Sequence, residues 1–228
     1  MTRPIPPKTA DVVVFGTGLF AECVHFLLTH DSPYRVVAFT VHGDRLEGQP
    51  KEKFGVPVVP FEQCVKQYPP DKYQMFVAVG YTGLNRIRAK IYGEAKALGY
   101  KLITYISSKC TYWGSEIGDN CFIFEDNTIQ PFVKIGNDVV LWSGNHIGHH
   151  GTIGDHVFIS SHVVVSGQVE IGPYCFLGVN ATLRDGIRLG ESCLIGAGAL
   201  IMKSVQDRGL VIAKRTELDP RRSDELKF

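Results

Sequence analysis

An aliphatic residue recurs at every sixth position through the second half of the chain. The fifteen positions form one unbroken phase and are Ile117, Ile123, Ile129, Ile135, Leu141, Ile147, Ile153, Ile159, Val165, Ile171, Leu177, Leu183, Leu189, Ile195 and Ile201. Composition alone does not produce such a run, because Ile, Leu and Val are a minority in any ordinary domain. A period of six fits neither the 3.6-residue helix nor the simple alternating strand. It predicts short strands that meet at corners, three to a coil, in a left-handed parallel β-helix of five coils.

The positions between the aliphatic residues agree with this interpretation. Residues two and three places after the aliphatic are mostly Asn, Asp, Gly, Ser or Pro, as in Asn137-Asp138 and Ser143-Gly144. We expect them to form the corners, where glycine supplies positive φ angles and proline a fixed φ. Residues 18 positions apart should stack on one face, so Asn127 and Asn145 predict a ladder of hydrogen-bonded side-chain amides.

The first hundred residues follow a different pattern. Apolar strand runs cover 12–15, 35–41, 75–79 and 102–106, and helix patterns follow the first run as far as residue 28 and cover 85–98. Strands that alternate with helices predict an α/β N-terminal domain with a small parallel, Rossmann-like sheet. We therefore expect three parts: a nucleotide-sugar-binding α/β domain over 1–108, the β-helix over 109–205, and a charged tail over 206–228.

Composition narrows the class of protein. The 24 basic and 23 acidic residues leave a net charge of +1, which provides no electrostatic footprint for nucleic acid or for an anionic membrane. The first ten residues lack the apolar segment of a signal peptide, and no apolar run is long enough to cross a bilayer. The six cysteines include no C-x-x-C pair, so we expect reduced thiols in a cytoplasmic protein.

A glycine pair marks a candidate ligand site in the first half. Gly16 and Gly18 lie between a predicted strand and a predicted helix, the context in which a helix N-terminus binds phosphate. About a hundred residues are too few for a full dinucleotide fold, which favours a mononucleotide or a nucleotide sugar. Asp44, just past the second strand, is placed to hold a ribose hydroxyl. The alternative is a tight strand-to-helix turn that binds nothing.

Histidines supply the densest functional signal. Five of the eight fall within 17 residues, at His146, His149, His150, His156 and His162. In the coil register His149 and His150 occupy a corner, His156 and His162 take the matching position of the next two corners, and His146 points outward from a strand. Because none points inward, these are not core histidines. A neutral imidazole in a cleft is a suitable general base for an amine or hydroxyl that attacks a thioester.

At this point the sequence resembles a known family. The hexad array, the run His149-His150-x-x-Ile153-Gly154-Asp155 and the preceding GxG domain look like the bacterial hexapeptide-repeat sugar acyltransferases (NeuD/PglD-like). The resemblance covers residues 10–215. It implies a homotrimer in which acetyl-CoA lies between adjacent β-helices, no metal, an N-terminal domain that holds a nucleotide-linked sugar, and a role in O-antigen or polysaccharide biosynthesis.

The resemblance also implies roles for individual residues. His149 matches the family's base, and His150 stands where the family has an acidic partner, so Asp155 or Asn145 would orient His149, or His146 would be the base. A second family histidine, which contacts acetyl-CoA, falls on Phe158. The implied cofactor-binding residues are Val179 and Ala197 through their backbone amides, Gly167 nearby, His162, and Lys203 and Lys214 at the phosphates. The implied nucleotide-sugar contacts are Gly16, Thr17, Gly18, Gly80, Tyr81, Asn85 and Arg88.

The favoured reaction is N-acetylation of a dTDP- or UDP-linked 4-amino sugar. O-acetylation of a sugar hydroxyl, as in the sialic acid type, needs the same base and cofactor and remains an alternative. A γ-type carbonic anhydrase is an alternative of another class, since it is also a left-handed β-helix with histidines at subunit interfaces. Its zinc needs three converging imidazoles, two of them five residues apart, and no pair of the clustered histidines has that spacing. A non-catalytic scaffold is the third alternative.

Overall fold

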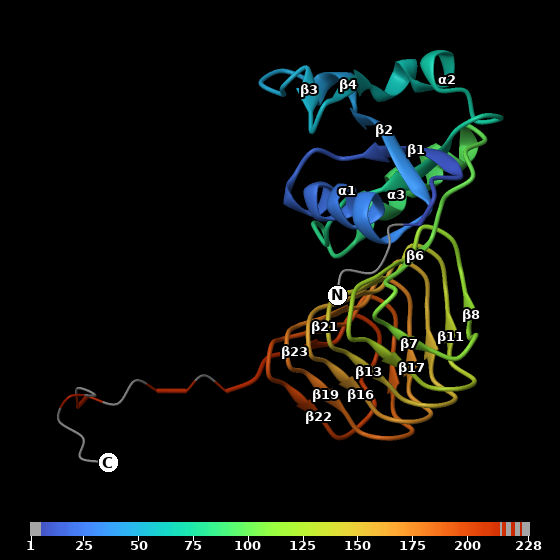
Figure 1. The fold of residues 1–228 in the computed structure, drawn as a ribbon. Coiled ribbons are helices and arrows are strands. Elements are labelled where there is room, and N and C mark those ends of the chain that lie inside the picture. Colours follow the sequence, from blue (N-terminus) through green and yellow to red (C-terminus); the bar gives the residue numbers. More distant parts are fainter. Residues whose placement is uncertain (1–5, 215, 218–219, 222–223, 225–228) are drawn as a thin grey trace.

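The computed structural model describes residues 6–214, 216–217, 220–221 and 224. An α/β domain forms the upper part of the molecule in Figure 1 and a long triangular coil forms the lower part. Both parts of the predicted fold are therefore confirmed.

The N-terminal sheet has the strand order β3-β4-β2-β1-β5 and is parallel except for the β3–β4 pair. Its elements are β1 (Ala10–Phe15), α1 (Leu19–Asp31), β2 (Tyr34–Val41), the 3₁₀ turn η1 (Gly43–Arg45), β3 (Glu52–Lys53), β4 (Val56–Pro60), the 3₁₀ turn η2 (Phe61–Gln63), α2 (Cys64–Gln67), β5 (Gln74–Val77) and α3 (Arg86–Ala97). Side chains of β1 alternate between two cores, as a strand requires: Val12 and Val14 pack with α1, and Val13 and Phe15 pack on the side of α3.

Two features of this domain differ from the prediction. The β3–β4 hairpin and α2 are not marked by any strong periodicity, because they are only two to five residues long. The expected last strand over 102–106 is wrong as a member of this sheet. Leu102 forms one isolated bridge to Met75, and the next residues leave the domain to start the coil.

The coil consists of two-residue strands stacked in three parallel sheets, and four-residue corners separate the strands except at the two ends of the coil, where three residues join β7 to β8 and eight join β22 to β23. The strands are β6 (Tyr105–Ile106), β7 (Thr111–Tyr112), β8 (Glu116–Ile117), β9 (Phe122–Ile123), β10 (Thr128–Ile129), β11 (Lys134–Ile135), β12 (Val140–Leu141), β13 (His146–Ile147), β14 (Thr152–Ile153), β15 (Phe158–Ile159), β16 (Val164–Val165), β17 (Glu170–Ile171), β18 (Phe176–Leu177), β19 (Thr182–Leu183), β20 (Arg188–Leu189), β21 (Leu194–Ile195), β22 (Leu200–Ile201) and β23 (Leu210–Val211). Pairing joins residues 18 apart, as in Thr128↔His146↔Val164. The strand pairing thus extends to β6, β7 and β23, which lie outside the range in which the six-residue period is visible in the sequence.

The predicted interior is confirmed. Fourteen of the fifteen aliphatic residues are at most 4% exposed and form one core, against which the fifteenth, Ile117, packs at the upper end. The inward amides do not form the expected ladder, however. Asn127 and Asn145 both donate to the backbone carbonyl of Trp142, and Asn145 accepts from the Val163 amide at 2.7 Å. Each of the two amides instead forms its hydrogen bonds with backbone groups of the corners.

The corners are the most regular feature of the backbone. The third residue after each aliphatic has a positive φ at fourteen consecutive positions from 120 to 198, and eleven of these residues are not glycine. The glycines that directly follow an aliphatic have ordinary φ angles and a different purpose. A Cβ on Gly148 would lie 2.5 Å from the carbonyl carbon of Ser166, and one on Gly178 would lie 2.5 Å from the Ala197 amide. These glycines let successive coils approach closely.

The outward side chains distinguish the three faces of the prism. The covered face (Tyr105, Phe122, Val140, Phe158, Phe176, Leu194 and Leu210) is apolar, and its upper part packs under the N-terminal domain. The charged face carries Glu116, Lys134, Thr152, Glu170 and Arg188, all exposed. The plain face carries Thr111, Thr128, His146, Val164, Thr182 and Leu200, with no Lys, Arg, Asp or Glu among them.

Three edges join these faces, and each is a column of corner residues. The seam edge, between the charged and covered faces, runs through Asp119, Asn137, Asp155, Pro173 and Glu191, each followed by one residue of a second column: Asn120, Asp138, His156, Tyr174 and Ser192. The amide edge, between the covered and plain faces, runs through Glu125, Ser143, Ser161, Val179 and Ala197. The histidine edge, between the plain and charged faces, runs through Pro131, His149, Gly167 and Asp185.

Helix α3 fixes the two domains together along the seam edge. Arg88 is fully buried, with Nε 3.1 Å from Oδ1 of Asp138, and donates to the backbone carbonyls of Asp138 and His156 at 3.0 Å. His156 Nδ1 lies 2.8 Å from the other oxygen of Asp138. Asn120 donates to the Asp138 carboxylate at 2.7 Å and accepts from the Val77 amide. The orientation of the N-terminal domain is thus set by buried, directional contacts.

Candidate functional site

The histidine edge presents a pair of imidazoles. His149 and His150 are both exposed, and their Nδ1 atoms are 3.1 Å apart. One Nδ1 must donate to the other, and when His149 donates, its Nε2 keeps a lone pair and can accept a proton. His150 in turn packs against the ring of Phe132 at 4.6 Å. The second histidine therefore stands where an orienting group for His149 is needed.

The other predicted orienting residues have different contacts. Asn145 is buried in the coil interior, and Asp155 accepts from the backbone and side chain of Asn137 on the seam edge. Room for the His149 ring comes from Gly167, where an added Cβ would lie 2.8 Å from Nε2. The Gly167 amide already donates to Asp185 at 2.9 Å. The structure thus gives Gly167 a steric role beside His149, while its predicted contact with the cofactor stays a prediction.

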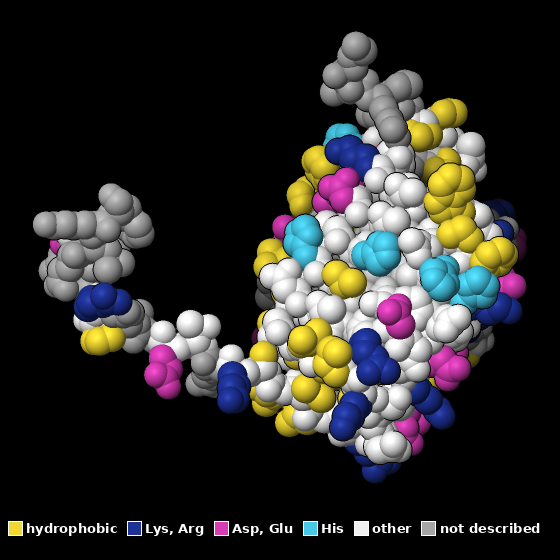
Figure 2. All heavy atoms as spheres, turned by 90° about the horizontal axis from the view of Figure 1, so that it is seen from below, with side chains coloured by type: hydrophobic (Ala, Val, Ile, Leu, Met, Phe, Trp, Pro, Cys, Tyr) yellow, Lys and Arg dark blue, Asp and Glu magenta, His cyan; other side chains and the backbone are white. Residues whose placement is uncertain are grey.

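The five clustered histidines do not converge. His149 and His150 lie on the histidine edge, His146 on the plain face, His162 exposed on the amide edge, and His156 in the seam. Figure 2 shows histidine side chains spread across the lower surface of the molecule. In the residues that the structure describes, no group of three or more His, Cys, Asp or Glu side chains is arranged to hold a metal ion.

Uncapped backbone amides distinguish the amide edge from the other two. On the seam and histidine edges, most of the equivalent positions are proline or have an N–H that donates to a side chain, as His149 does to Gln130 and Glu191 to Asp207. On the amide edge, five successive corners have an N–H without an acceptor anywhere in the described chain: Glu125, Ser143, Ser161, Val179 and Ala197. This column offers a row of parallel donors spaced by about 4.8 Å.

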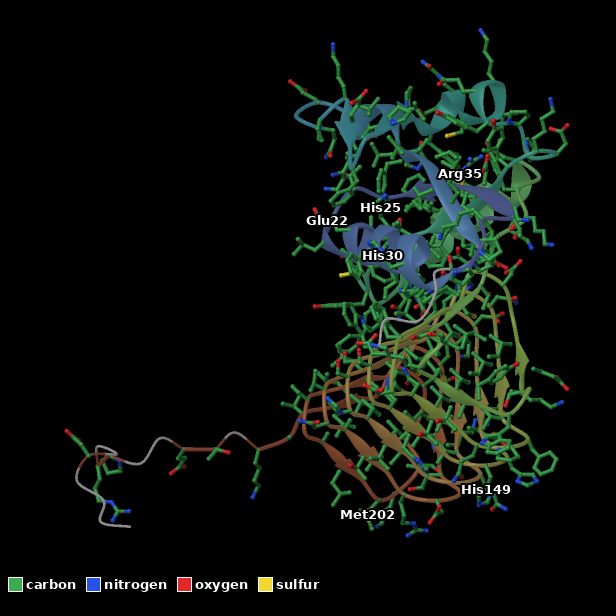
Figure 3. All side chains as sticks on the ribbon, viewed as in Figure 1. Glu22, His25, His30, Arg35, His149 and Met202 are labelled. Carbon is green, nitrogen blue, oxygen red and sulfur yellow. The ribbon has the colours of Figure 1, made fainter. Side chains whose placement is uncertain are left out.

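The predicted acyl-transfer residues divide between the two edges of the plain face. His149, His150, Gly167 and Lys203 belong to the histidine edge, and His162, Val179, Ala197 and Lys214 to the amide edge. Lys203 and Lys214 are both exposed. In Figure 3, His149 lies on the opposite side of the molecule from Glu22, His25 and His30, which stand above the amide edge. A single chain therefore does not bring its two sets of predicted residues together.

The predicted nucleotide loop has the expected local geometry. Gly16 has a φ of +116°, and a Cβ there would lie 2.6 Å from the Ala78 carbonyl oxygen, so no other residue fits. Thr17 is half-buried, and Gly18 precedes α1 without any side-chain cap. The first N–H groups of α1 are thus open to an anion. Asp44 is exposed in η1, where its only ion pair among the described residues is a 3.9 Å contact to Arg45.

The second predicted loop continues toward the coil. Gly80 accepts from Arg88 at 3.2 Å, and the half-exposed ring of Tyr81 packs against Phe158 and Phe176 at 5.1 and 4.7 Å. Phe158, the position of the family's second histidine, is therefore part of an aromatic wall below the nucleotide loop.

Asn85 and Arg88 are placed differently from the expectation. Both side chains are 0% exposed, so neither presents a polar atom to a nucleotide in this conformation. Asn85 donates to the backbone carbonyls of Tyr174 and Cys175 and accepts from Arg88. The helical spacing could have indicated that Arg88 is buried. Arg88 precedes the buried Ile91 and Ala95 by three and seven residues, which places it on the buried face of α3.

A cavity beside the amide edge was not expected from the sequence. It has a volume of about 650 Å³ and lies between α1 and the first two coils, lined by Glu22, Cys23, His25, Phe26, Leu27, His30, Phe54, Phe124, Glu125, Trp142 and Ser143. Its two walls are about a hundred residues apart in sequence, so no local pattern marks it.

No helix among the described residues is long and apolar enough to span a membrane.

Two family models match the coil. The bacterial transferase hexapeptide model (six repeats) matches residues 114–149 and 150–185, and the hexapeptide repeat of succinyl-transferase matches 168–203. No curated protein matches the chain.

Solved structures share the fold over most of the chain. Perosamine N-acetyltransferase from Caulobacter crescentus, in complex with CoA and GDP-perosamine, is 23% identical with a TM-score of 0.77, covering 88% of this chain and 92% of that one. The acetyltransferase domain of PglB from Neisseria gonorrhoeae, in complex with acetyl coenzyme A, is 25% identical with a TM-score of 0.75, covering 88% and 94%. WeeI from Acinetobacter baumannii is 19% identical with a TM-score of 0.75, covering 90% and 97%.

Proposed function

We propose that this chain transfers an acetyl group from acetyl-CoA to the amino group of a nucleotide-linked 4-amino sugar, because its coil matches the hexapeptide transferase models and its fold is shared with sugar acetyltransferases of the NeuD/PglD type. Solved relatives that bind CoA or acetyl-CoA, one of them together with GDP-perosamine, support this proposal. The nucleotide predicted from the sequence is dTDP or UDP, and GDP joins the candidates through the likeness to the perosamine enzyme. The product would be a precursor of O-antigen or another polysaccharide.

The observation that carries the proposal is the column of uncapped amides on the amide edge. The pantetheine arm of CoA contains two amide groups whose carbonyls need donors, and the free N–H groups of Val179 and Ala197 offer them. Val179 and Ala197 are exposed, so a ligand can reach these N–H groups without breaking any hydrogen bond within the described chain. Lys214, just beyond the last coil at this edge, would meet the CoA phosphates.

The site we propose is completed by a second copy of the chain. The base lies on the histidine edge and the cofactor strip on the amide edge, at opposite margins of the plain face. A cyclic trimer that turns its plain faces toward the symmetry axis would bring the histidine edge of each copy to the amide edge of the next. The uncharged outer residues of the plain face suit burial, whereas those of the charged face suit solvent.

The proposed reaction is a direct transfer. His149 Nε2 accepts a proton from the sugar amine as the amine nitrogen attacks the thioester carbonyl, and the C–N bond forms. Free backbone N–H groups of the amide edge would stabilise the oxyanion of the tetrahedral intermediate. When the intermediate collapses, the C–S bond breaks and the CoA thiolate leaves, taking the proton from His149. The nucleotide would be held by Gly16, Thr17 and Gly18 at its phosphates and by Asp44 at its ribose.

The function is tested by measuring thiol release from acetyl-CoA with UDP-, dTDP- and GDP-linked 4-amino sugars and with their 4-hydroxy counterparts. We expect release with an amino sugar, and a loss of kcat/KM on the order of 10²–10⁴ in His149→Ala. Glu170→Ala, on the charged face, is the matched control and should be unaffected. Release with the hydroxy sugars alone would replace N-acetylation by O-acetylation, and no release with any of them would remove the proposal.

The cofactor strip has its own test, because proline already occupies the equivalent corner position at Pro131 and Pro173. Val179→Pro and Ala197→Pro each remove one N–H at a site where the coil accepts proline. We expect a higher KM for acetyl-CoA with an unchanged melting temperature. An unchanged KM in both variants would show that these amides do not bind the cofactor.

A further inference from the structure

The cavity beside the amide edge has an aromatic wall. Phe124 and Trp142 stack with ring centroids 4.4 Å apart and planes only 10° from parallel, and Phe20 supports Trp142 from behind at 6.2 Å. Phe26 and Phe54 close the outer side. A flat aromatic surface of this kind binds the C–H face of a sugar ring and attracts a nearby cation through its π-electrons.

The charged side chains around the cavity favour a cationic ligand. Glu22 is paired with Lys53 at 2.7 Å. Glu125 accepts one hydrogen bond, from the Ser143 hydroxyl at 2.9 Å, and no lysine or arginine among the described residues forms an ion pair with it. Its carboxylate thus remains available to a cationic ligand.

No lysine or arginine lines the cavity, and Lys53 beside it is balanced by Glu22. Burial is the main cause that lowers the pKa of His25, which favours a neutral ring at neutral pH. Burial, with a smaller contribution from Glu22, raises the pKa of the Cys23 thiol, which favours its protonated form. A cavity with this balance disfavours phosphate and CoA and favours a cation or a neutral ring.

Resting on the proposed function, we propose that this cavity is the acceptor-sugar subsite, in which Glu125 binds the ammonium group of the amino sugar and Trp142 stacks on its ring. Its position agrees with the nucleotide loop: Glu22 and Cys23 follow Gly18 by four and five residues, about 6–8 Å along α1. Ser143 and His149 are adjacent corners of one coil, so in the cyclic trimer the neighbouring copy would present its His149 at this height of the amide edge. Glu125 would then select an amine over a hydroxyl. The bound ammonium group releases one proton to water, and the resulting neutral amine attacks the thioester while His149 accepts its second proton.

The test uses the fluorescence of Trp142. The chain has two tryptophans, so the Trp113→Phe variant of the full chain leaves Trp142 as the only reporter, inside the cavity. We would titrate it with GDP-perosamine and with a dTDP-linked 4-amino-4,6-dideoxyglucose, and then with the same nucleotide sugars carrying a hydroxyl at C4. Binding of the amino sugars should change the fluorescence, and Glu125→Gln should weaken it by roughly 10- to 100-fold, the range expected for a hydrogen bond to a charged group.

Two controls separate this inference from the function itself. Asp126→Asn removes the neighbouring exposed carboxylate at the same corner. It should change neither the affinity for the amino sugars nor the affinity for their hydroxy counterparts. The KM for acetyl-CoA should be the same in Glu125→Gln and in the parent. If Glu125→Gln acetylates and binds the amino sugar as well as the parent does, the subsite is elsewhere while the proposed function stands. If the parent binds the amino sugars selectively without acetylating them, the function fails while the subsite stands.

Discussion

Single glycines are required in this chain for two different steric reasons. Gly16 combines a positive φ with a close approach to Ala78, whereas glycines such as Gly148 have ordinary φ angles and are needed only because the next coil is so near. Gly18 meets neither condition: its φ is −78°, and an added Cβ would have no atom within 4 Å. No steric constraint of the fold therefore requires glycine at position 18.

The Gly18→Ala variant tests this difference at the level of one methyl group. We expect an unchanged melting temperature and a KM for the nucleotide sugar raised by about tenfold, because the methyl would meet the phosphates at the start of α1. Gly16→Ala is the contrasting variant and should lower the melting temperature by several degrees, since it strains the backbone and clashes with Ala78. An unchanged KM in Gly18→Ala would indicate a turn without a ligand.

Individual residues also show how far the sequence was informative. The coil could be predicted because its code is local: each hexad repeats the same inward side chain and the same corner. The roles of Asn85 and Arg88 could not be predicted from their types, because a polar residue after a glycine-rich strand end is equally compatible with a ligand and with a buried contact. Only the placement of α3 against Asp138 distinguishes the two.

At the level of elements, α3 and the seam edge behave as one unit. Asn120, Asp138 and His156 lie on successive turns of the coil along the seam edge. Each has a partner on the same edge or in the N-terminal domain. The carboxylate of Asp138 is fully buried and depends on Arg88 for its neutralising charge. Buried pairs of this kind are costly to break on one side only.

Arg88→Met therefore provides a test of the seam. It keeps the buried apolar stem and removes the charge, leaving the Asp138 carboxylate without its strongest partner. We expect a loss of about 3–5 kcal/mol in the free energy of unfolding, measured by urea denaturation. Arg86→Met, two residues earlier on the exposed side of the helix, should cost less than about 1 kcal/mol. Equal effects of the two substitutions would contradict a central role for Arg88.

The end of α1 ties the domains together at a second point, and this contact depends on pH. Asp31 accepts from the Tyr105 hydroxyl at 2.8 Å and the Ser108 amide at 2.9 Å. Burial raises its pKa, but the hydrogen bonds from Ser108, Tyr105 and Ser107 outweigh burial, so the folded-state pKa lies below the ordinary value of 3.8. A depressed carboxyl pKa stabilises the folded state above the unfolded pKa, and the contribution disappears as the pH falls through the folded pKa.

We therefore expect Asp31→Asn to lower the free energy of unfolding by about 1–2 kcal/mol at pH 7. The difference from the parent should shrink as the pH falls below 3.8 toward the folded pKa, because the parent carboxyl then becomes protonated as well. Urea denaturation of both proteins from pH 7 down to the acid limit of folding measures this. A difference that stays constant over that range would contradict the ionic origin of the contact.

For the whole molecule, the three faces of the coil have separate purposes. The covered face carries the N-terminal domain, the charged face meets solvent with exposed ion pairs such as Lys134–Glu116, and the plain face is left without a partner in one chain. The sequence could not reveal this division, because the six-residue period is the same on all three faces and only the 18-residue columns differ. The cavity is missed for the related reason that contacts between distant segments leave no local pattern.

Mixing two impaired variants tests the proposed shared site. His149→Ala lacks the base but keeps its amide edge, and Ala197→Pro has the opposite defect. At an acetyl-CoA concentration well below the raised KM of Ala197→Pro, joint refolding of equal amounts should raise the activity above that of either variant, because about one site in four combines an intact histidine edge with an intact amide edge from a neighbour. Each variant refolded alone is the control and should keep its low activity at that concentration. A mixture with no more activity than its components would mean that each site belongs to one chain.

The eighteen-residue turn of the coil also limits how the length of this protein can change. One residue inserted within a coil would turn every later aliphatic side chain out of the interior, as a register slip does in a sheet. Six inserted residues would preserve the interior but rotate all later columns by one third of a turn, so Val179 and Ala197 would arrive on the wrong side of the prism. Only whole turns leave every column where it is, so we expect homologues to lengthen or shorten this half of the chain eighteen residues at a time.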